Sequence, residues 1–412
     1  MTNGPIQNNY AYITLLTNDN YLPGIIILNE SLKSVNSKYP LKCIVTDYVS
    51  EQVITELNSY NIETIKVNTI YFPDKIAEFN KQIDQKFAET WKHCLAKLYC
   101  FTFTNYDKVI FLDADLLILK NVDHCFEMPH MTAALDGEYS NIWPKWPHFN
   151  AGFMVIKPNK AEFNNILKFI GKINPEEITY NFTDKHYVIA DQEILNLYYS
   201  NWANETDKHL NKYYNIFAPH LNTICTTDVY ENAYFIHFIG WKPWNMPDIE
   251  YSGQLTTKLN LFFYIYALAF YDIFMENHSL TIDWSDLITN GAFYERMCAI
   301  ALDVFFEPEI AAQILGYIPK TYTNYQKIVQ TIENNRLLKQ LQPILFTLVE
   351  ASRQQIFAGV KDPEQLSDLN YLMFLDEIRN LKPLAARSLL ADLWHAVHQA
   401  IKKYLQTASD MS

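Results

Sequence analysis

The stretch Lys108-Val109-Ile110-Phe111-Leu112-Asp113-Ala114-Asp115 decides the fold class of this chain. Its β-branched and aromatic residues predict a buried strand that ends at Leu112. Asp113 and Asp115 would then lie at the carboxyl edge of a sheet, where open α/β folds bind ligands. Carboxylate oxygens at that edge suit Mn²⁺ or Mg²⁺ held against a diphosphate. A turn or a helix cap is the alternative interpretation of two aspartates after a strand.

Strand and helix patterns alternate on both sides of this stretch. Alternating elements of this size predict an α/β fold with a largely parallel sheet. We expect strands at residues 10–16, 41–46, 63–67, 108–112, 133–136, 149–156 and 234–238, and helices at 25–35, 51–59 and 191–199.

The pattern changes at about Leu255, where strand signals stop and helical periods take over. Prolines lie between these periods or at their starts, as is typical where one helix ends and the next begins. We expect helices at 291–306, 324–341, 343–358, 364–381 and 385–405. The chain is therefore expected to have an α/β domain at residues 1–254 and a helical domain at 255–412.

The composition disfavours several classes of protein. The 412 residues carry a formal net charge of −13, which disfavours a nucleic-acid binder because phosphate contacts need clustered Lys and Arg. No apolar stretch is long enough to predict a transmembrane segment. The six Cys show no paired metal spacing, and Met1 to Asn9 lacks a secretory pattern, so we expect reduced thiols and a cytoplasmic location. Aromatic residues at 15% fit either stacking surfaces for sugars or bases, or a tyrosine-rich core.

Four blocks of sequence carry a family resemblance. In chain order they are Thr14-Leu15-Leu16-Thr17-Asn18-Asp19-Asn20-Tyr21, Ala96-Lys97-Leu98-Tyr99-Cys100-Phe101 running into Asp113-Ala114-Asp115, Phe149-Asn150-Ala151-Gly152-Phe153 with Asp191-Gln192 downstream, and His237-Phe238-Ile239-Gly240-Trp241-Lys242-Pro243-Trp244. On these blocks, residues 10–246 resemble glycosyltransferase family 8, and within it the glycogenins. The resemblance implies a GT-A fold with a Rossmann-like mixed sheet, a UDP-sugar donor, Mn²⁺ and retention of the anomeric configuration.

The resemblance also implies a metal site. Asp113, Asp115 and His237 would hold Mn²⁺, or Mg²⁺, and carboxylate plus imidazole is an apt ligand set for such an ion. The metal would neutralise the diphosphate and stabilise the departing UDP. Gly240 would let the backbone approach phosphate, and Lys242 would add a point charge to the β-phosphate. An ordinary histidine at a strand edge and a solvated lysine are the alternatives.

The remaining residues of the implied site hold the donor. The uridine-binding start matches the segment from Leu15 to Tyr21, and Lys97 corresponds to a lysine that contacts the donor near its phosphates. Asp191 and Gln192 match positions beside the anomeric carbon, and with Lys97 they form the expected catalytic set. Asp136 follows a strand and could touch sugar hydroxyls. The full expected donor site is Leu15, Thr17, Asn18, Tyr21, Lys97, Asp113, Ala114, Asp115, Asp136, Asn150, Ala151, Gly152, Asp191, Gln192, His237, Gly240 and Lys242. The alternatives are a strand–turn–helix at the start, a helix-surface Lys97 and a helix N-cap at Asp191.

Transfer with retention needs either a carboxylate nucleophile or attack on the same face, assisted by the leaving phosphate. Asp191 is the only carboxylate that the motifs place well for the first route. Gln192 would stabilise an oxocarbenium-like centre rather than attack it. We favour attack on the same face, with an oxygen of UDP as the base.

The chain departs from the glycogenin pattern at two positions. Glycogenins carry an aspartate three residues before the Asp-Gln pair, where this chain has Val188. Their self-glucosylated tyrosine aligns with Asn222, which offers no hydroxyl. The helical region does not resemble their tail either, and fits a microbial effector-type enzyme with a targeting domain, which would act in the host cytosol.

We therefore expect a hexosyltransferase that moves a hexose, glucose in the first instance, from UDP-glucose to a protein or other acceptor in trans. The alternatives are a self-glucosylating glycogen primer and an inactive UDP-sugar-binding scaffold. The helical domain would be a structural cap, or a module that contacts a membrane surface or a protein partner. The segment 385–405, with Lys402 and Lys403 beside Trp394, is a basic amphipathic helix that motivates the membrane contact.

Overall fold

A computed structural model describes residues 9–136, 148–178, 187–222, 232–240, 242–244, 258–276 and 291–340. The chain divides into two compact units, Met1–Leu287 and Ile288–Ser412. The first unit thus extends beyond residue 254, where the change in sequence pattern led us to expect a boundary. The reason is α8 (Lys258–Glu276), which packs on α1 and belongs to the first unit although its sequence is helical.

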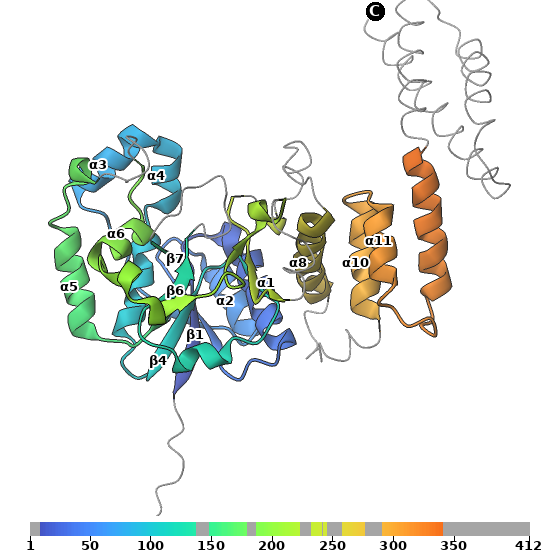
Figure 1. Ribbon diagram of the computed structural model, residues 1–412, viewed down its shortest axis with the longest axis horizontal. Helices are drawn as coiled ribbons and strands as arrows, with labels where there is room; N and C mark the ends of the chain where they lie inside the picture. The colour runs from blue at the N-terminus through green and yellow to red at the C-terminus, as the bar shows by residue number, and fades with distance from the viewer. Residues whose placement is uncertain are drawn as a thin grey trace, which may run out of the picture. The chain divides into compact units, whose positions relative to one another are not determined.

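The first unit is built on a mixed sheet with the strand order β3-β2-β1-β4-β7-β6-β8. From β3 to β4 all neighbours are parallel, whereas β7 runs antiparallel to β4 and β6 (Figure 1). The strands are β1 (Tyr10–Leu16), β2 (Leu41–Val45), β3 (Glu63–Lys66), β4 (Lys108–Leu112), β6 (Thr132–Leu135), β7 (Phe149–Ile156) and β8 (His209–Leu210). The expected α/β class with a mixed sheet is confirmed.

A second, smaller sheet has the order β5-β10-β9, with β5 (Leu116–Ile118), β9 (Ile216–Phe217) and β10 (Phe235–His237). β10 pairs antiparallel with β5, so that His237 lies opposite Leu116. The strand expected at 234–238 therefore exists, but it lies in this sheet rather than in the large one. β5 and β9 had no expected counterpart, because strands of this length depend on their partners more than on their own sequence.

Helices flank the large sheet, with α1 and α2 on one side and α5 and α6 on the other (Figure 1). The α-helices of this unit besides α8 are α1 (Leu22–Ser34), α2 (Glu51–Ser59), α3 (Asp74–Ile83), α4 (Gln85–Trp91), α5 (Lys160–Ile170) and α6 (Asp191–Tyr198). The 3₁₀ segments are η1 (Asp19–Tyr21), η2 (Cys94–Thr102), η3 (Asp123–Glu127), η4 (Pro175–Glu177), η5 (Trp202–Asn204), η6 (Thr206–Lys208) and η7 (Ala218–Asn222). Side-chain caps begin several helices: Ser50 accepts from Val53 N at 3.3 Å, and Asn159 accepts from Ala161 N at 2.9 Å.

The core of this unit surrounds β4 and β7, which supply the most deeply buried apolar residues. Val109, Ile110 and Phe111 are fully buried, and every residue of β7 is buried. Burial on both faces explains why both strands read as continuous apolar runs. The buried core therefore holds the end of β4 in place, and with it the backbone of Asp113 and Asp115, which follow directly.

The second unit is helical in the part that the structure describes. It contains α10 (Ala292–Asp303), α11 (Pro308–Leu315), which packs on α10, and a helix through residues 325–340. The helices expected at 291–306 and 324–341 are confirmed in type, and α11 is additional. The helices expected at 343–358, 364–381 and 385–405 lie outside the described residues. Within the described part of the chain, no helix has the length and apolar character needed to cross a membrane.

Candidate active site

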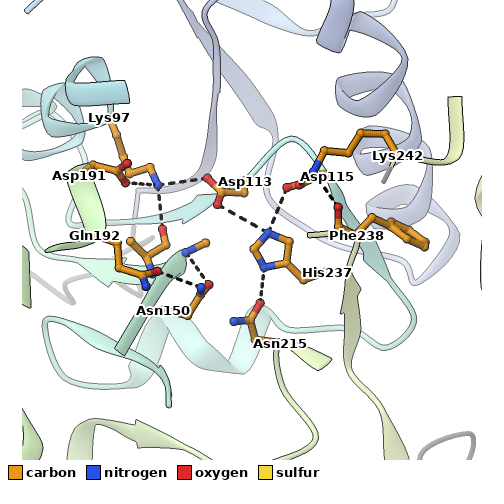
Figure 2. Close-up of polar contacts among 12 residues, drawn as sticks. Lys97, Asp113, Asp115, Asn150, Asp191, Gln192, Asn215, His237, Phe238 and Lys242 are labelled. Carbon is orange, nitrogen blue, oxygen red and sulfur yellow. Dashed lines mark hydrogen bonds and ion pairs between the residues drawn. The ribbon is translucent and has the colours of Figure 1, made fainter. Parts of the chain in front are cut away.

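The candidate site lies where the two sheets meet, at the end of β4. Asp113 N donates to Gly152 O of β7 at 2.8 Å, and Phe238 N donates to Asp115 O at 2.9 Å. These backbone bonds tie the Asp113-Ala114-Asp115 segment to β7 on one side and to the end of β10 on the other. The two aspartates therefore lie on ordered backbone between the sheets (Figure 2).

Asp113, Asp115 and His237 form a compact group of potential metal ligands. His237 Nε2 lies 3.1 Å from Asp115 Oδ1 and 3.8 Å from Asp113 Oδ2. One ligand atom from each of the three residues lies within 4.8 Å of the others. Two carboxylates and one imidazole are donors that suit Mn²⁺, so the residues present fit the ion that the resemblance implies.

Asn215 orients the histidine of this group. Its Oδ1 lies 2.9 Å from His237 Nδ1, so a proton on Nδ1 leaves the lone pair of Nε2 directed at the aspartates (Figure 2). Asn215 has a φ of 56°, a left-handed conformation that asparagine tolerates better than most residues. The sequence analysis missed Asn215, because it lies outside the quoted motifs and reaches His237 only through the pairing of β9 with β10.

Lys242 neutralises the second aspartate. Its Nζ donates to Asp115 Oδ2 and, at 2.7 Å, to Phe238 O. Burial opposes ionisation of Asp115, but the Lys242 ammonium and His237 hold the pKa of this carboxyl well below its usual range. Burial has the opposite outcome at Asp113, whose pKa is raised despite the nearby Lys97. Asp115 is therefore the more strongly ionised carboxylate of the two.

Lys97 is buried and joins the two halves of the site. Its Nζ lies 3.2 Å from Asp113 Oδ1 and 2.5 Å from Asp191 Oδ2, and it donates to Ala151 O at 3.1 Å. Burial disfavours its charge, but the two carboxylates raise the pKa of Lys97 above its ordinary value. The helix-surface alternative for Lys97 is therefore wrong. The N-cap alternative for Asp191 is also wrong, because Ala190 occupies the cap and Asp191 is the first residue of α6.

Gln192 is held by hydrogen bonds at both ends of its amide. Its Oε1 accepts from Asn150 Nδ2 at 2.9 Å and from Ala151 N at 3.0 Å, and its Nε2 donates to Asp136 Oδ2 at 3.0 Å. Burial raises the pKa of Asp136 to about 6, and the bond from Gln192 opposes that shift. This network fixes the orientation of the Gln192 side chain.

Gly152 permits the close packing of the site. A Cβ on this residue would lie 2.6 Å from His237 Cε1 and 2.8 Å from Asn150 Oδ1. Side chains do not approach so closely, so only glycine lets β7 pass beneath the metal-ligand group and the Gln192 network. Gly240 has a φ of +77°, a conformation that also favours glycine.

The residues surround a cavity of about 440 Å³. It is lined by every residue of the expected donor site except Asp136 and Gly152, which lie behind the lining and contact Gln192 and His237. Lining residues that the sequence analysis did not assign to the donor site are Phe87, Thr90, Trp91, Cys94, Val188, Ala190, Glu193 and Ile239. Most of these residues come from the segments around α4 and α6. Tertiary packing places these segments beside β4, so the sequence analysis could not assign them to the site.

Comparison with known proteins finds glycosyltransferases among the matches. The family model described as "Glycosyl transferase family 8" matches residues 12–247. Human glycogenin-2 is 31% identical over 258 residues, which make up 61% of this chain and 47% of glycogenin-2. UDP-glucuronate:xylan alpha-glucuronosyltransferase 2 of Arabidopsis thaliana is 29% identical over 246 residues, 57% of this chain and 35% of that enzyme. The chain thus spans half or less of the length of these relatives.

Among solved structures, the galactosyltransferase LgtC with donor and acceptor sugar analogs has 18% identity and a TM-score of 0.40, over 61% of this chain and 95% of that one.

The family match also covers the whole candidate site. Its first residue precedes Leu15, and its last follows Lys242. Residues 248–412, which include the second unit, lie beyond it. Over the larger part of its length, and over every residue of the site described above, the chain belongs to glycosyl transferase family 8.

Proposed function

We propose that the protein is a metal-dependent, retaining glycosyltransferase that moves glucose from UDP-glucose to a separate acceptor. The observation that carries the proposal is the cavity that joins a metal-ligand group to a catalytic group. Asp113, Asp115 and His237 form the first. Lys97, Asp191 and Gln192 form the second, and Lys97 links the two through its ion pairs. Such an arrangement can hold a nucleoside diphosphate at one end and a sugar at the other.

Each group has a distinct role in this proposal. A bound Mn²⁺ supplies positive charge to the diphosphate as it leaves. Lys242 and the backbone at Gly240 bind the β-phosphate, and the lining residues Leu15, Thr17, Asn18 and Tyr21 bind the uridine. Lys97 holds Asp113 and Asp191 in place. Tyr21 and Trp244 make an edge-type contact, with 5.8 Å between their ring centroids. This aromatic pair supports a role for the Tyr21 ring in stacking on the uracil base.

The hydrogen bonds of Gln192 and Asp191 favour attack on the same face as the departing UDP. Both bonds to Gln192 Oε1 come from N–H groups, so this oxygen is engaged and serves as a fixed dipole near the anomeric carbon. Asp191 Oδ2 is engaged by the Lys97 ammonium at 2.5 Å, which lowers its strength as a nucleophile. The acceptor hydroxyl then loses its proton to a phosphate oxygen of UDP.

A neutral hexose is favoured as the sugar. The Arabidopsis relative is named for a glucuronate donor, whose carboxylate calls for a cation. The cations among the described lining residues are Lys97 and Lys242, and each is paired with aspartate. The acceptor is proposed to be a separate molecule because Asn222, at the position of the glycogenin tyrosine, has no hydroxyl. Its neighbours 223–230 lie outside the described residues.

We further propose a cytoplasmic location and an effector-type role, with the helical region as a cap or targeting module. The described cysteines Cys43, Cys94, Cys100, Cys125 and Cys298 are buried and free, which supports a reducing compartment. The effector role rests on the helical unit, which lies outside the family match.

Hydrolysis of a panel of UDP-sugars, with Mn²⁺ and with EDTA, tests the proposed activity. We expect UDP-glucose to be hydrolysed fastest, and only with the metal. Faster turnover of UDP-glucuronate or UDP-galactose would contradict the proposed donor. No turnover of any UDP-sugar would favour the inactive scaffold. Intact mass after incubation with UDP-glucose and Mn²⁺ tests the primer alternative, which a ladder of added hexoses would restore.

A further inference from the structure

Two aromatic side chains of α4 form an exposed surface that the donor site does not use. Phe87 and Trp91 are one helical turn apart, so they share a face of the helix. Their ring centroids lie 5.9 Å apart with an interplanar angle of 24°. Phe87 is 51% exposed and Trp91 is 37% exposed. We call this pair the α4 ledge.

The ledge is held in place at the start of its helix. Asp84 accepts a hydrogen bond from Phe87 N at 2.9 Å and caps α4. α4 also packs on α3, whose Asn80 is tied to the backbone of Ile189, two residues before Asp191. The rings therefore belong to a structure that is connected to the catalytic end of the site.

The ledge lines the same cavity as the catalytic residues. Both rings are among the lining residues, together with Lys97 and Asp191. Lys97 and Asp191 are buried, with 5% and 3% exposure, whereas the ledge is open to solvent. The ledge thus lies on the solvent side of the cavity. Exposed aromatic groups at a cavity mouth are a common sign of ligand binding.

The chemistry of the ledge and its surroundings fits a neutral ligand. Apart from the expected donor residues and the two rings, the described lining consists of Thr90, Cys94, Val188, Ala190, Glu193 and Ile239, and it offers no cation. Glu193 is the acidic residue among them, and its Oε2 already accepts a hydrogen bond from Ala190 N at 2.9 Å. Thr90 Oγ1 donates to Lys86 O at 2.9 Å, so its donor is used within the helix. Two nearly parallel rings with few hydrogen-bonding groups beside them suit the C–H face of a sugar ring, because the electron-rich face of an aromatic ring attracts C–H groups.

We propose that the α4 ledge is the acceptor subsite of this transferase and that the acceptor is a neutral saccharide. This inference rests on the proposed function. Sugar rings of the acceptor stack on Trp91 and Phe87 and present a hydroxyl to the donor. In the transfer, that hydroxyl oxygen bonds to the anomeric carbon, the bond from this carbon to the UDP oxygen breaks, and the hydroxyl proton passes to the phosphate of the released UDP.

The test uses the full chain with UDP, Mn²⁺ and a panel of maltotetraose, cellotetraose and xylotetraose. Direct binding is measured by saturation-transfer NMR and calorimetry, and transfer from UDP-glucose is measured beside hydrolysis. A peptide that contains tyrosine and serine is the contrasting acceptor. The variants are Trp91→Ala, Phe87→Ala and the conservative Trp91→Phe. Tyr317→Ala is the matched control, because Tyr317 is 55% exposed in the second unit and does not line the cavity.

We expect at least one tetrasaccharide to bind and accept glucose. Trp91→Ala should raise its KM at least tenfold and lower the ratio of transfer to hydrolysis, Trp91→Phe should restore most of both, and Tyr317→Ala should match the wild type. Equal KM values in Trp91→Ala and the wild type, or transfer to the peptide without saccharide binding, would overturn the inference. Hydrolysis of UDP-glucose with no saccharide binding would overturn it and leave the proposed function standing. Saccharide binding that depends on Trp91, in a protein that hydrolyses no UDP-sugar, would support the ledge and count against the transferase.

Discussion

Lys97 Nζ lies 2.5 Å from Asp191 Oδ2, and both side chains are buried. The same ammonium is 3.2 Å from Asp113 Oδ1. One cation thus compensates a carboxylate on each side of the cavity. A buried ion pair contributes little net stability when complete, but the loss of one partner leaves a buried charge without compensation.

Lys97→Met should therefore destabilise the first unit and abolish turnover. We expect a loss of about 3–5 kcal/mol, the usual cost of breaking a buried pair from one side. Chemical denaturation followed by tryptophan fluorescence measures the stability. Lys92→Met is the control, because Lys92 pairs with Glu89 on the surface at 3.0 Å and should cost less than about 1 kcal/mol. Equal stability of the two variants would contradict the role assigned to Lys97.

Asp115→Asn should remove metal-dependent binding of UDP. The substitution keeps the shape of the side chain but deletes the charge shared with His237 and Lys242. Calorimetry with UDP and Mn²⁺ should show at least a tenfold loss of affinity, about 1.4 kcal/mol. Asp303→Asn in α10, an exposed position outside the cavity lining, should bind like the wild type. Binding of UDP by the wild type at equal strength in EDTA would refute the metal assignment.

Asn215→Ala should weaken Mn²⁺ binding by about 10–100-fold, the effect expected when a partner that orients a metal-binding histidine is lost. Asn215→Asp keeps an oxygen that accepts from His237 Nδ1 and tolerates the φ of 56°, so it should retain more affinity. The paramagnetic signal of free Mn²⁺ measures the affinity of both. If both variants bind Mn²⁺ like the wild type, the bond at 2.9 Å does not orient His237 for metal.

Glu193 should make stability depend on pH. Burial raises the pKa of Glu193 to about 7, and its Oε2 accepts from Ala190 N. For a raised pKa, the stabilising contribution is complete below the unfolded value, near 4.3, and is lost as the pH rises through about 7. Glu193→Gln removes this titration and keeps an acceptor. The wild type should therefore lose stability relative to Glu193→Gln between pH 4 and 7, on the order of 3 kcal/mol. Denaturation curves across this pH range measure it, and a constant difference would contradict the prediction.

Gly152→Ala should disrupt the site and lower the melting temperature. The added Cβ would lie 2.6 Å from His237 Cε1 and 2.8 Å from Asn150 Oδ1, so both side chains must move. Differential scanning calorimetry and UDP binding measure the effect. Gly171→Ala is the matched control, because its Cβ would meet only Lys168 O, at 3.6 Å. The control should keep binding and should be as stable as the wild type or slightly more stable, since alanine restricts the unfolded chain. Similar behaviour of the two variants would argue against close packing at Gly152.

The strands of the large sheet other than the two-residue β8 could be predicted from sequence, and for the central strands burial decides the composition. β1, β4 and β7 have the expected limits, and their apolar runs reflect burial on both faces. The small sheet could not be predicted in the same way. β5 and β9 are too short to carry a pattern, and they exist because β10 supplies their hydrogen bonds.

The residues of the candidate site also fall into those that the sequence predicts and those that it does not. Asp113, Asp115 and His237 belong to motifs, so the sequence could indicate them. Tertiary packing brings Asn215 and the α4 ledge to the site. The spacing of residues along the sequence therefore does not predict that they lie there. The boundary of the first unit was missed for a related reason, because a change from strand to helix pattern does not reveal that α8 packs on α1.

The pairing of β10 with β5 links the candidate metal-ligand group to the order in which the chain is made. Asp115 and Lys242 are 127 positions apart, and His237 comes from β10, the last strand of the first unit among the residues that the structure describes. During synthesis the chain emerges from its N-terminus, so the aspartates are present long before the histidine and lysine that balance them. A chain interrupted before β10 would expose an acidic edge that lacks both its imidazole and its ammonium. The candidate metal-ligand group is therefore complete only after β10 has been made and has paired with β5.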